Sequence, residues 1–144
     1  MIGKVFFVHA DNWWISTGNT EGSLEVASWL ANEAQYSHKM VKWFEDQIIN
    51  YDFETKKTNF IGSGNAHHIF STGDHIFLMC EYVDEQKVLL TKEACLKALE
   101  NYRSFLNSDY KNLEVTPEPF KIEYIAEGEE ALAKFTELGG VLKA

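Results

Sequence analysis

The feature that most constrains the fold is a pair of apolar segments, in the middle of the chain, that flank a turn signal. Residues Ala66–Phe70 and His75–Tyr82 lie on either side of Ser71-Thr72-Gly73-Asp74, an arrangement typical of a β-hairpin. With the two middle residues as the turn, His68 would face Phe77. Both faces would be apolar, which favours a central position in a sheet. One face would carry Ile69, Ile76, Leu78 and Cys80, and the other His68, Phe70, His75, Phe77 and Met79.

The remaining elements are predicted from apolar periodicity and from capping residues. Strands are expected at 4–9, 13–17, 88–90 and 120–126. Helices are expected at 24–34, 38–50 and 92–106, with Ser23, Ser37 and Thr91 as N-caps, and a last helix is expected to begin near Glu127. No element is expected in the polar stretch 53–65. This order predicts an α+β fold, a mostly antiparallel β-sheet with helices packed on one face, in which residues 1–144 form a single domain.

The charge of the chain excludes some partners and favours others. There are 22 acidic and 13 basic residues, a formal net charge of −9, and Arg103 is the only arginine. Nucleic-acid binding needs clustered basic residues, so neither nucleic acid nor an anionic membrane is expected as a partner. A basic protein is the expected charged partner, unless the acidity serves only to keep the protein in solution. Seven acids against Lys121 and Lys134 make 114–137 the expected negative patch.

The cysteines and the apolar runs indicate the compartment. Cys80 and Cys95 are the only cysteines and form no C-x-x-C pair, so both are expected to be reduced thiols in the core. The sequence shows no recognisable signal peptide and no apolar run of the roughly 20 residues that a membrane span needs. A cytoplasmic location is therefore expected.

Catalytic motifs are weak. Gly62-Ser63-Gly64-Asn65 contains a G-x-G, but a strand is expected after it rather than the helix of a dinucleotide loop, so a turn is predicted. No G-x-S-x-G nucleophile motif occurs, and both cysteines fall inside expected regular elements. No pair of carboxylates stands out as a general acid and base. The sequence therefore predicts no catalytic residue and no cofactor.

Three histidines in the hairpin invite comparison with a metal site. The pleat places His67 and His68 on opposite faces, so only His68 and His75 would share a face, as diagonal neighbours. A third ligand would have to come from elsewhere, for instance Glu81 or His9. Ordinary sheet histidines are expected here, and no metal is predicted.

The aromatic residues suggest a contact surface. They make up 14% of the chain, and many are expected in the core. Trp13 and Trp14 are adjacent, and neighbours in a strand face opposite ways, so one of the two is expected to be exposed. Exposed tryptophan and tyrosine are common at interface hot spots.

Three stretches carry a resemblance to a known family: Gly64-Asn65 before the hairpin, Glu81-Tyr82-Val83-Asp84 after it, and Val88-Leu89-Leu90-Thr91 opening a helix that holds Tyr102 and Phe105. This layout, over residues 22–106, resembles small bacterial immunity proteins of polymorphic toxin systems, including the antidotes of contact-dependent growth inhibition. The resemblance implies a small acidic cytoplasmic protein without catalysis that binds a cognate toxin and blocks its active site.

The sequence thus predicts a non-catalytic, immunity-type inhibitor, a monomer or homodimer, that captures and neutralises a basic toxin domain such as a nuclease. The predicted partner-binding acids are Asp84, Glu85, Glu123, Glu127, Glu129 and Glu130, and the predicted apolar contacts are Trp13, Trp14 and Tyr124. One alternative is a small enzyme or a ligand- or metal-binding domain whose pocket uses His68, His75 and Cys80. Another is a dimeric scaffold joined through an exposed strand edge.

Overall fold

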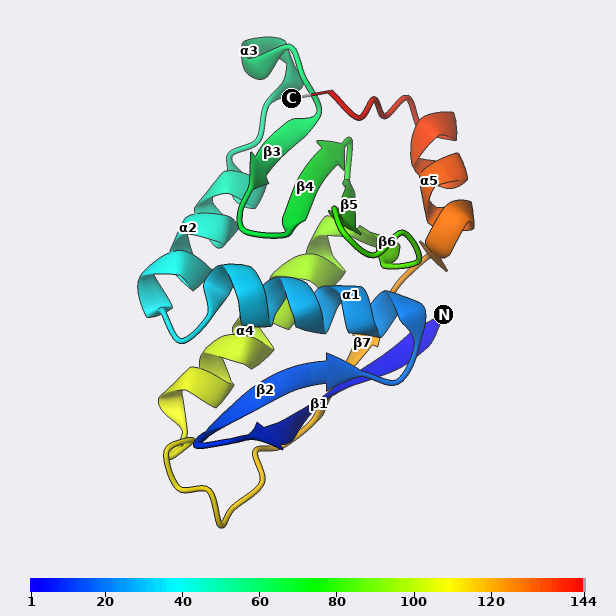
Figure 1. The fold of residues 1–144 in the computed structure, drawn as a ribbon. Helices are drawn as coiled ribbons and strands as arrows, with labels where there is room; N and C mark the ends of the chain where they lie inside the picture. Colours follow the sequence, from blue (N-terminus) through cyan, green and yellow to red (C-terminus); the bar gives the residue numbers. More distant parts are fainter. Residues whose placement is uncertain (144) are drawn as a thin grey trace.

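Two antiparallel sheets organise the chain in the computed structural model, which describes residues 1–143 (Figure 1). The first sheet has the strand order β2-β1-β7, and the second has the order β3-β4-β5-β6-β8. The strands are β1 Ile2–Ala10, β2 Trp13–Gly18, β3 Phe60–Ser63, β4 His67–Thr72, β5 His75–Cys80, β6 Lys87–Thr91, β7 Phe120–Glu123 and β8 Ala126–Glu127. The predicted α+β class with antiparallel strands is confirmed.

The helices begin at hydroxyl caps in three cases, two of which were predicted. They are α1 Glu21–Trp29, the π-helix η1 Leu30–Ala34, α2 His38–Ile49, α3 Phe53–Lys56, α4 Lys92–Asn107 and α5 Gly128–Glu137. The side chains of Ser37 and Thr91 accept hydrogen bonds from backbone N–H groups of the first turns of α2 and α4, as predicted. The prediction for Ser23 is wrong, because Thr20 caps α1 and Ser23 is the third helical residue of a capping box.

The central hairpin forms with a register that differs from the prediction by two residues. Thr72 pairs with His75, so Gly73-Asp74 is the turn, and His68 faces Met79 rather than Phe77. Gly73 has a φ of 54°, and a two-residue hairpin turn readily takes glycine at its first central position. Because a shift of two residues preserves the alternation of side chains, the predicted membership of the two faces is unchanged.

Helices cover both faces of the five-stranded sheet, whereas one covered face was expected. One face contributes Ile69 and Leu78 to a large apolar cluster that also contains residues of α1, α2 and α4. The other face carries Phe77, which stacks on Phe135 of α5 with ring centroids 5.0 Å apart. The apolar character of both faces of the hairpin is therefore explained by a helix layer on each side.

The two sheets share the large cluster. Val5 and Ile122 of the first sheet and Leu78 of the second belong to it, and all three are buried. Trp29, at the end of α1, is 1% exposed and packs against Phe44 of α2 with ring centroids 5.0 Å apart. Helix α1 is the element that lies between the sheets in Figure 1. Side chains on α1 are consequently screened from water by strands of both sheets.

The stretch expected as one strand at 120–126 is divided between the sheets. β7 pairs with β1 of the first sheet, and β8 pairs with β6 of the second. Between them, the N–H of Tyr124 donates to the carbonyl of Met1 and the N–H of Ile125 donates to the carbonyl of Leu89. The chain therefore crosses from one sheet to the other within these residues and enters α5 directly afterwards.

Short elements also occur in the polar stretch where none was expected. It contains α3 and the edge strand β3, which pairs with β4.

Among residues 1–143, no helix combines the length and the apolar character needed to cross a membrane.

Candidate functional site

An exposed group of acids is formed by the β5–β6 loop, residues 81–86, together with the first turn of α5. Lys87 joins the two segments, because its Nζ lies 3.0 Å from a carboxylate oxygen of Asp84 and 3.1 Å from one of Glu129. The side chain of Lys87 is 4% exposed, whereas those of Asp84 and Glu129 are 88% and 72% exposed. We call the exposed acids of these segments, with Tyr82, the acidic surface: Glu81, Asp84, Glu85, Glu129 and Glu130.

The acidic surface depends on the charge of Lys87. Burial by itself lowers the pKa of this ammonium group, but the hydrogen bonds and negative charges of Asp84 and Glu129 outweigh burial and raise the pKa. Lys87 therefore stays charged and holds the loop against α5. Because the ammonium group is buried behind its two partners, it offers little positive charge to an approaching molecule.

An exposed aromatic ring lies among these acids. Tyr82 is 73% exposed, and the neighbouring Val83 is 39% exposed. The loop that carries them is closed by backbone hydrogen bonds, from the N–H of Gln86 to the carbonyl of Val83 and from the N–H of Cys80 to the carbonyl of Gln86. Tyr82 was not among the predicted contact residues, because it lies at the end of the strand expected at 75–82.

Four of the six predicted acids lie together. Asp84, Glu85, Glu129 and Glu130 lie together on the acidic surface. Glu123 is exposed elsewhere, on β7, where it pairs with a residue of β1.

Glu127, the remaining predicted acid, has an internal role. It is half-buried, and its Oε1 accepts hydrogen bonds from the N–H of Gly22 and the hydroxyl of Tyr124, each at 2.8 Å. A carboxylate at this position satisfies a free N–H of the first turn of α1. Glu127 therefore links α1 to the segment that crosses between the sheets.

The predicted aromatic contacts are corrected by burial. Trp13 is 47% exposed, but Trp14 is 6% and Tyr124 is 4% exposed, so neither of the last two offers its ring to a partner. The prediction that one of the adjacent tryptophans is exposed is confirmed. Trp13 lies at the turn between β1 and β2, which is at the opposite end of the molecule from α5 (Figure 1).

The pocket suggested for His68, His75 and Cys80 does not form. His68 and His75 lie on the face of the hairpin opposite to that of Cys80. His68 has a carboxylate oxygen of Glu81 3.7 Å from its Nε2, and no third ligand from residues 1–143 joins that pair. Cys80 instead lies beside His67 and Glu25, on the face of the hairpin that also carries Ile69 and Leu78.

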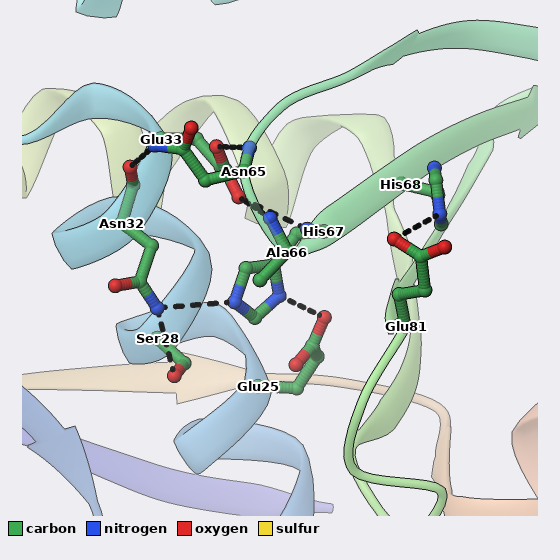
Figure 2. A network of polar contacts seen from close by, with 9 residues as sticks. All are labelled: Glu25, Ser28, Asn32, Glu33, Asn65, Ala66, His67, His68 and Glu81. Atoms are coloured by element: carbon green, nitrogen blue, oxygen red, sulfur yellow. Dashed lines mark hydrogen bonds and ion pairs between the residues drawn. The ribbon is translucent and has the colours of Figure 1, made fainter.

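Three buried side chains with metal-binding chemistry meet there, and we call them the buried cluster: Glu25 of α1, His67 of β4 and Cys80 of β5 (Figure 2 shows the first two). His67 and Cys80 face each other across the hairpin. One ligand atom from each of the three residues lies within 4.8 Å of the other two. The side chains of Glu25 and His67 are both completely buried.

Hydrogen bonds fix the imidazole of His67 at both nitrogens. Its Nδ1 lies 2.8 Å from Oε2 of Glu25, and its Nε2 lies 3.3 Å from the amide nitrogen of Asn32 (Figure 2). With the amide of Asn32 donating to Nε2, the ring proton is on Nδ1 and is donated to Glu25. The other carboxyl oxygen of Glu25, Oε1, is buried without a hydrogen-bond partner in the described part of the chain.

Burial controls the protonation of this pair. Burial, reinforced by the negative charge of Glu33, raises the pKa of Glu25 to about 9. Burial lowers the pKa of His67, against the opposing influence of Glu33. At neutral pH, both groups of the pair are therefore uncharged.

Glu33 holds the backbone that leads into His67. Its carboxylate accepts hydrogen bonds from the N–H groups of Asn65, Ala66 and His67 at 2.7–2.9 Å (Figure 2). A Cβ at Gly64 would lie 1.8 Å from Oε1 of Glu33, so the close approach of this carboxylate requires a glycine. The G-x-G of the sequence is thus a turn, as predicted, and its second glycine makes room for Glu33.

A groove of about 460 Å³ lies away from both sites, between the end of α4 and the loop before β7. Its lining includes Phe105, Tyr110, Pro117 and Phe120. Two acids, Asp109 and Glu118, also line it, but it contains no histidine, cysteine or lysine.

Comparisons with known proteins do not assign a function to these sites. No family model matches the chain, and neither curated proteins nor solved structures gave a match. The likeness to immunity proteins therefore stays a prediction, and any assignment depends on the charges and contacts described above.

Proposed function

We propose that this chain is a non-catalytic, immunity-type binding protein that captures a basic protein, a toxin domain such as a nuclease. The observation that carries the proposal is the acidic surface, where an exposed tyrosine lies among five exposed carboxylates. A ring with charges of one sign around it suits a partner that presents lysines and arginines around an apolar contact.

The charge balance of this surface favours a cationic partner. Its five carboxylates are accompanied by two lysines, Lys87 and Lys134, both of which already pair with acids of the surface. The whole chain adds to the local field with a net charge of −9. Such a field accelerates the encounter with a protein of opposite charge and makes the association rate fall as salt rises.

After the encounter, Tyr82 would supply the apolar contact. Tyrosine combines a large ring with a hydroxyl group and loses little conformational entropy on binding, which makes it a frequent hot-spot residue. Backbone hydrogen bonds already order the loop around Tyr82, so the binding surface is largely formed in the free protein. Blocking the toxin's active site would then follow from covering it, without a chemical step.

The proposal is tested with the product of the neighbouring gene, because antidotes are commonly encoded beside their toxins. We expect the two proteins to co-purify and the association rate to fall with ionic strength. Replacing Asp84, Glu85 and Glu130 by lysine should slow association by about tenfold or more. The matched control replaces Glu54, Glu114 and Glu118, three exposed acids outside the acidic surface, by lysine and should have a much smaller effect.

A second variant tests the apolar contact. Tyr82→Ala should speed dissociation of the complex by about tenfold or more, whereas Phe53→Ala, which truncates another exposed ring, should not. The proposal fails if no basic protein co-purifies, or if the control variants weaken binding as much as those on the acidic surface.

A further inference from the structure

The buried cluster is not explained by the proposed function. Glu25, His67 and Cys80 come from three different elements, and none of them reaches the acidic surface. Buried polar atoms are normally paired, yet Oε1 of Glu25 has no partner among residues 1–143. A buried carboxyl oxygen without a hydrogen bond, beside an imidazole and a thiol, points to a position where a ligand could bind.

The chemistry of the three groups identifies that ligand. Imidazole, thiolate and carboxylate are the side chains that bind Zn²⁺, whereas Mg²⁺ and Ca²⁺ prefer oxygen alone. A carboxylate and a thiolate together carry two negative charges, which are unfavourable in a buried site unless a cation balances them. One divalent zinc ion would neutralise both negative charges, and Oε1 of Glu25, which has no hydrogen-bond partner among residues 1–143, could bind it.

The surroundings of the cluster resemble the support that metal-bound histidines usually have. Zinc bound at Nδ1 of His67 would replace the hydrogen bond between that nitrogen and Glu25, while Asn32 contacts the other ring nitrogen, Nε2. Nε2 would then carry the ring proton, and the side-chain amide of Asn32, turned to present its oxygen, would accept it, as the outer partner of a zinc-bound histidine usually does. Glu33 fixes the backbone of the same histidine through its N–H. The ring can therefore turn only slightly, and a metal ion would meet a ligand that is already oriented.

We propose that the buried cluster is a zinc site with Glu25, His67 and Cys80 as protein ligands. Three protein ligands leave the fourth tetrahedral position to a water molecule. The ion would connect α1 to both strands of the central hairpin, and so the site would stabilise the fold. Binding would release protons from the ligands, so affinity should rise with pH. This proposal holds whether or not the chain binds a toxin.

Cobalt(II) provides the most direct test, because a thiolate bound to cobalt gives an intense charge-transfer absorption in the near ultraviolet. Chelator-treated full-length protein is titrated with Co²⁺, and one equivalent is expected to saturate that absorption. Cys80→Ala should abolish it, while Cys95→Ala should retain it, because Cys95 is buried and belongs to no group of three possible metal ligands among residues 1–143. Zn²⁺ added afterwards should displace the cobalt and remove the absorption.

A second measurement compares the two adjacent histidines. His67→Gln should weaken Zn²⁺ binding by more than about tenfold in competition with a chromophoric chelator, and His68→Gln should leave it unchanged. Zn²⁺ should also raise the melting temperature of the wild-type protein, but not that of Glu25→Gln. The proposal is overturned if the wild-type protein lacks the cobalt absorption, or if the absorption survives Cys80→Ala. Neither result depends on whether the variant at position 67 folds.

Discussion

At the scale of single residues, protonation of Glu25 and His67 is the most unusual property of the chain. Their polar atoms lie 2.8 Å apart, and both side chains are completely buried. Water would ordinarily favour the charged form of each group, and its exclusion reverses that preference. The free energy of unfolding of the metal-free protein must therefore depend on pH, with opposite contributions from the two groups.

The sign of the dependence differs between the two groups. The pKa of Glu25 rises from 4.5 to about 9 on folding, so the unfolded chain binds fewer protons in that range and stability falls as pH rises. The pKa of His67 is lowered from 6.5, so its contribution to stability falls as pH drops below 6.5. Between pH 6.5 and 9 the contribution of Glu25 therefore dominates.

We predict that the unfolding free energy of metal-free wild-type protein falls over this range, with a slope of up to about 1.4 kcal/mol per pH unit. Glu25→Gln removes the titrating carboxyl group and should flatten that slope, while His68→Gln should keep it. Urea unfolding in the presence of a chelator, at several pH values, measures the slopes. Equal slopes for wild type and Glu25→Gln would show that the carboxyl is ionised in the folded protein.

Individual residues are where prediction from sequence was least complete. Apolar spacing within the helix expected at 24–34 predicts that Leu24 faces inward, yet Leu24 is half-buried and Glu25 is completely buried. Hydrophobic periodicity cannot indicate a buried acid, because burial of Glu25 depends on His67, more than forty residues away. The opposite orientation of His67 and His68 was predicted correctly, since the pleat of one strand decides it.

At the scale of elements, the turn before β4 is held by one side chain rather than by a ladder of strands. Glu33 accepts three consecutive backbone N–H groups, which strands or water would otherwise have to satisfy. It comes from η1, the π-helical turn that follows α1. π-Helical turns often occur at functional sites, and this one directs a carboxylate across to the hairpin.

We predict that Gly64→Ala lowers the unfolding free energy by about 1–3 kcal/mol, because the new methyl group would displace Glu33 from the N–H groups that it accepts. The amides of Asn65, Ala66 and His67 should then exchange with deuterium faster than in the wild type. Ser63→Ala, at an exposed neighbouring position, should change neither quantity appreciably. Unchanged exchange in Gly64→Ala would mean that the turn does not depend on Glu33.

Elements with local determinants were predicted better than those with distant ones. The caps of α2 and α4 were correct because a hydroxyl and the N–H group it accepts lie within one turn. The strand expected at 120–126 was wrong as a single unit because its two halves pair with strands of different sheets. The hairpin register was misplaced by two residues because either Thr72-Gly73 or Gly73-Asp74 satisfies the turn pattern.

At the scale of the whole molecule, α5 determines whether the acidic surface exists. Phe135 of α5 is completely buried and stacks on Phe77 of the sheet, while Glu129 at the start of the helix reaches Lys87. The α+β class could be predicted from the order of elements, but a second helix layer could not, because it depends on where one late helix docks. The contact between the β5–β6 loop and α5 also forms only when α5 docks on the sheet.

We predict that Phe135→Ala lowers the unfolding free energy by about 3–5 kcal/mol, since it removes a buried ring from a close-packed contact. Phe53→Ala, which truncates an exposed ring, should cost less than about 0.5 kcal/mol. Urea unfolding of both variants measures the difference. A cost for Phe135→Ala below about 1 kcal/mol would indicate that α5 contributes little to the folded state.

The pairing of β1 with β7 has a consequence for folding of the chain. Ile2 is matched with Glu123, so one edge of β1 is closed only by a strand that lies more than a hundred residues later in the chain. Contacts so distant along the chain slow folding, because a long loop must close before they form. Until then, the edge of β1 that β7 covers stays open, and an open strand edge can pair with another chain.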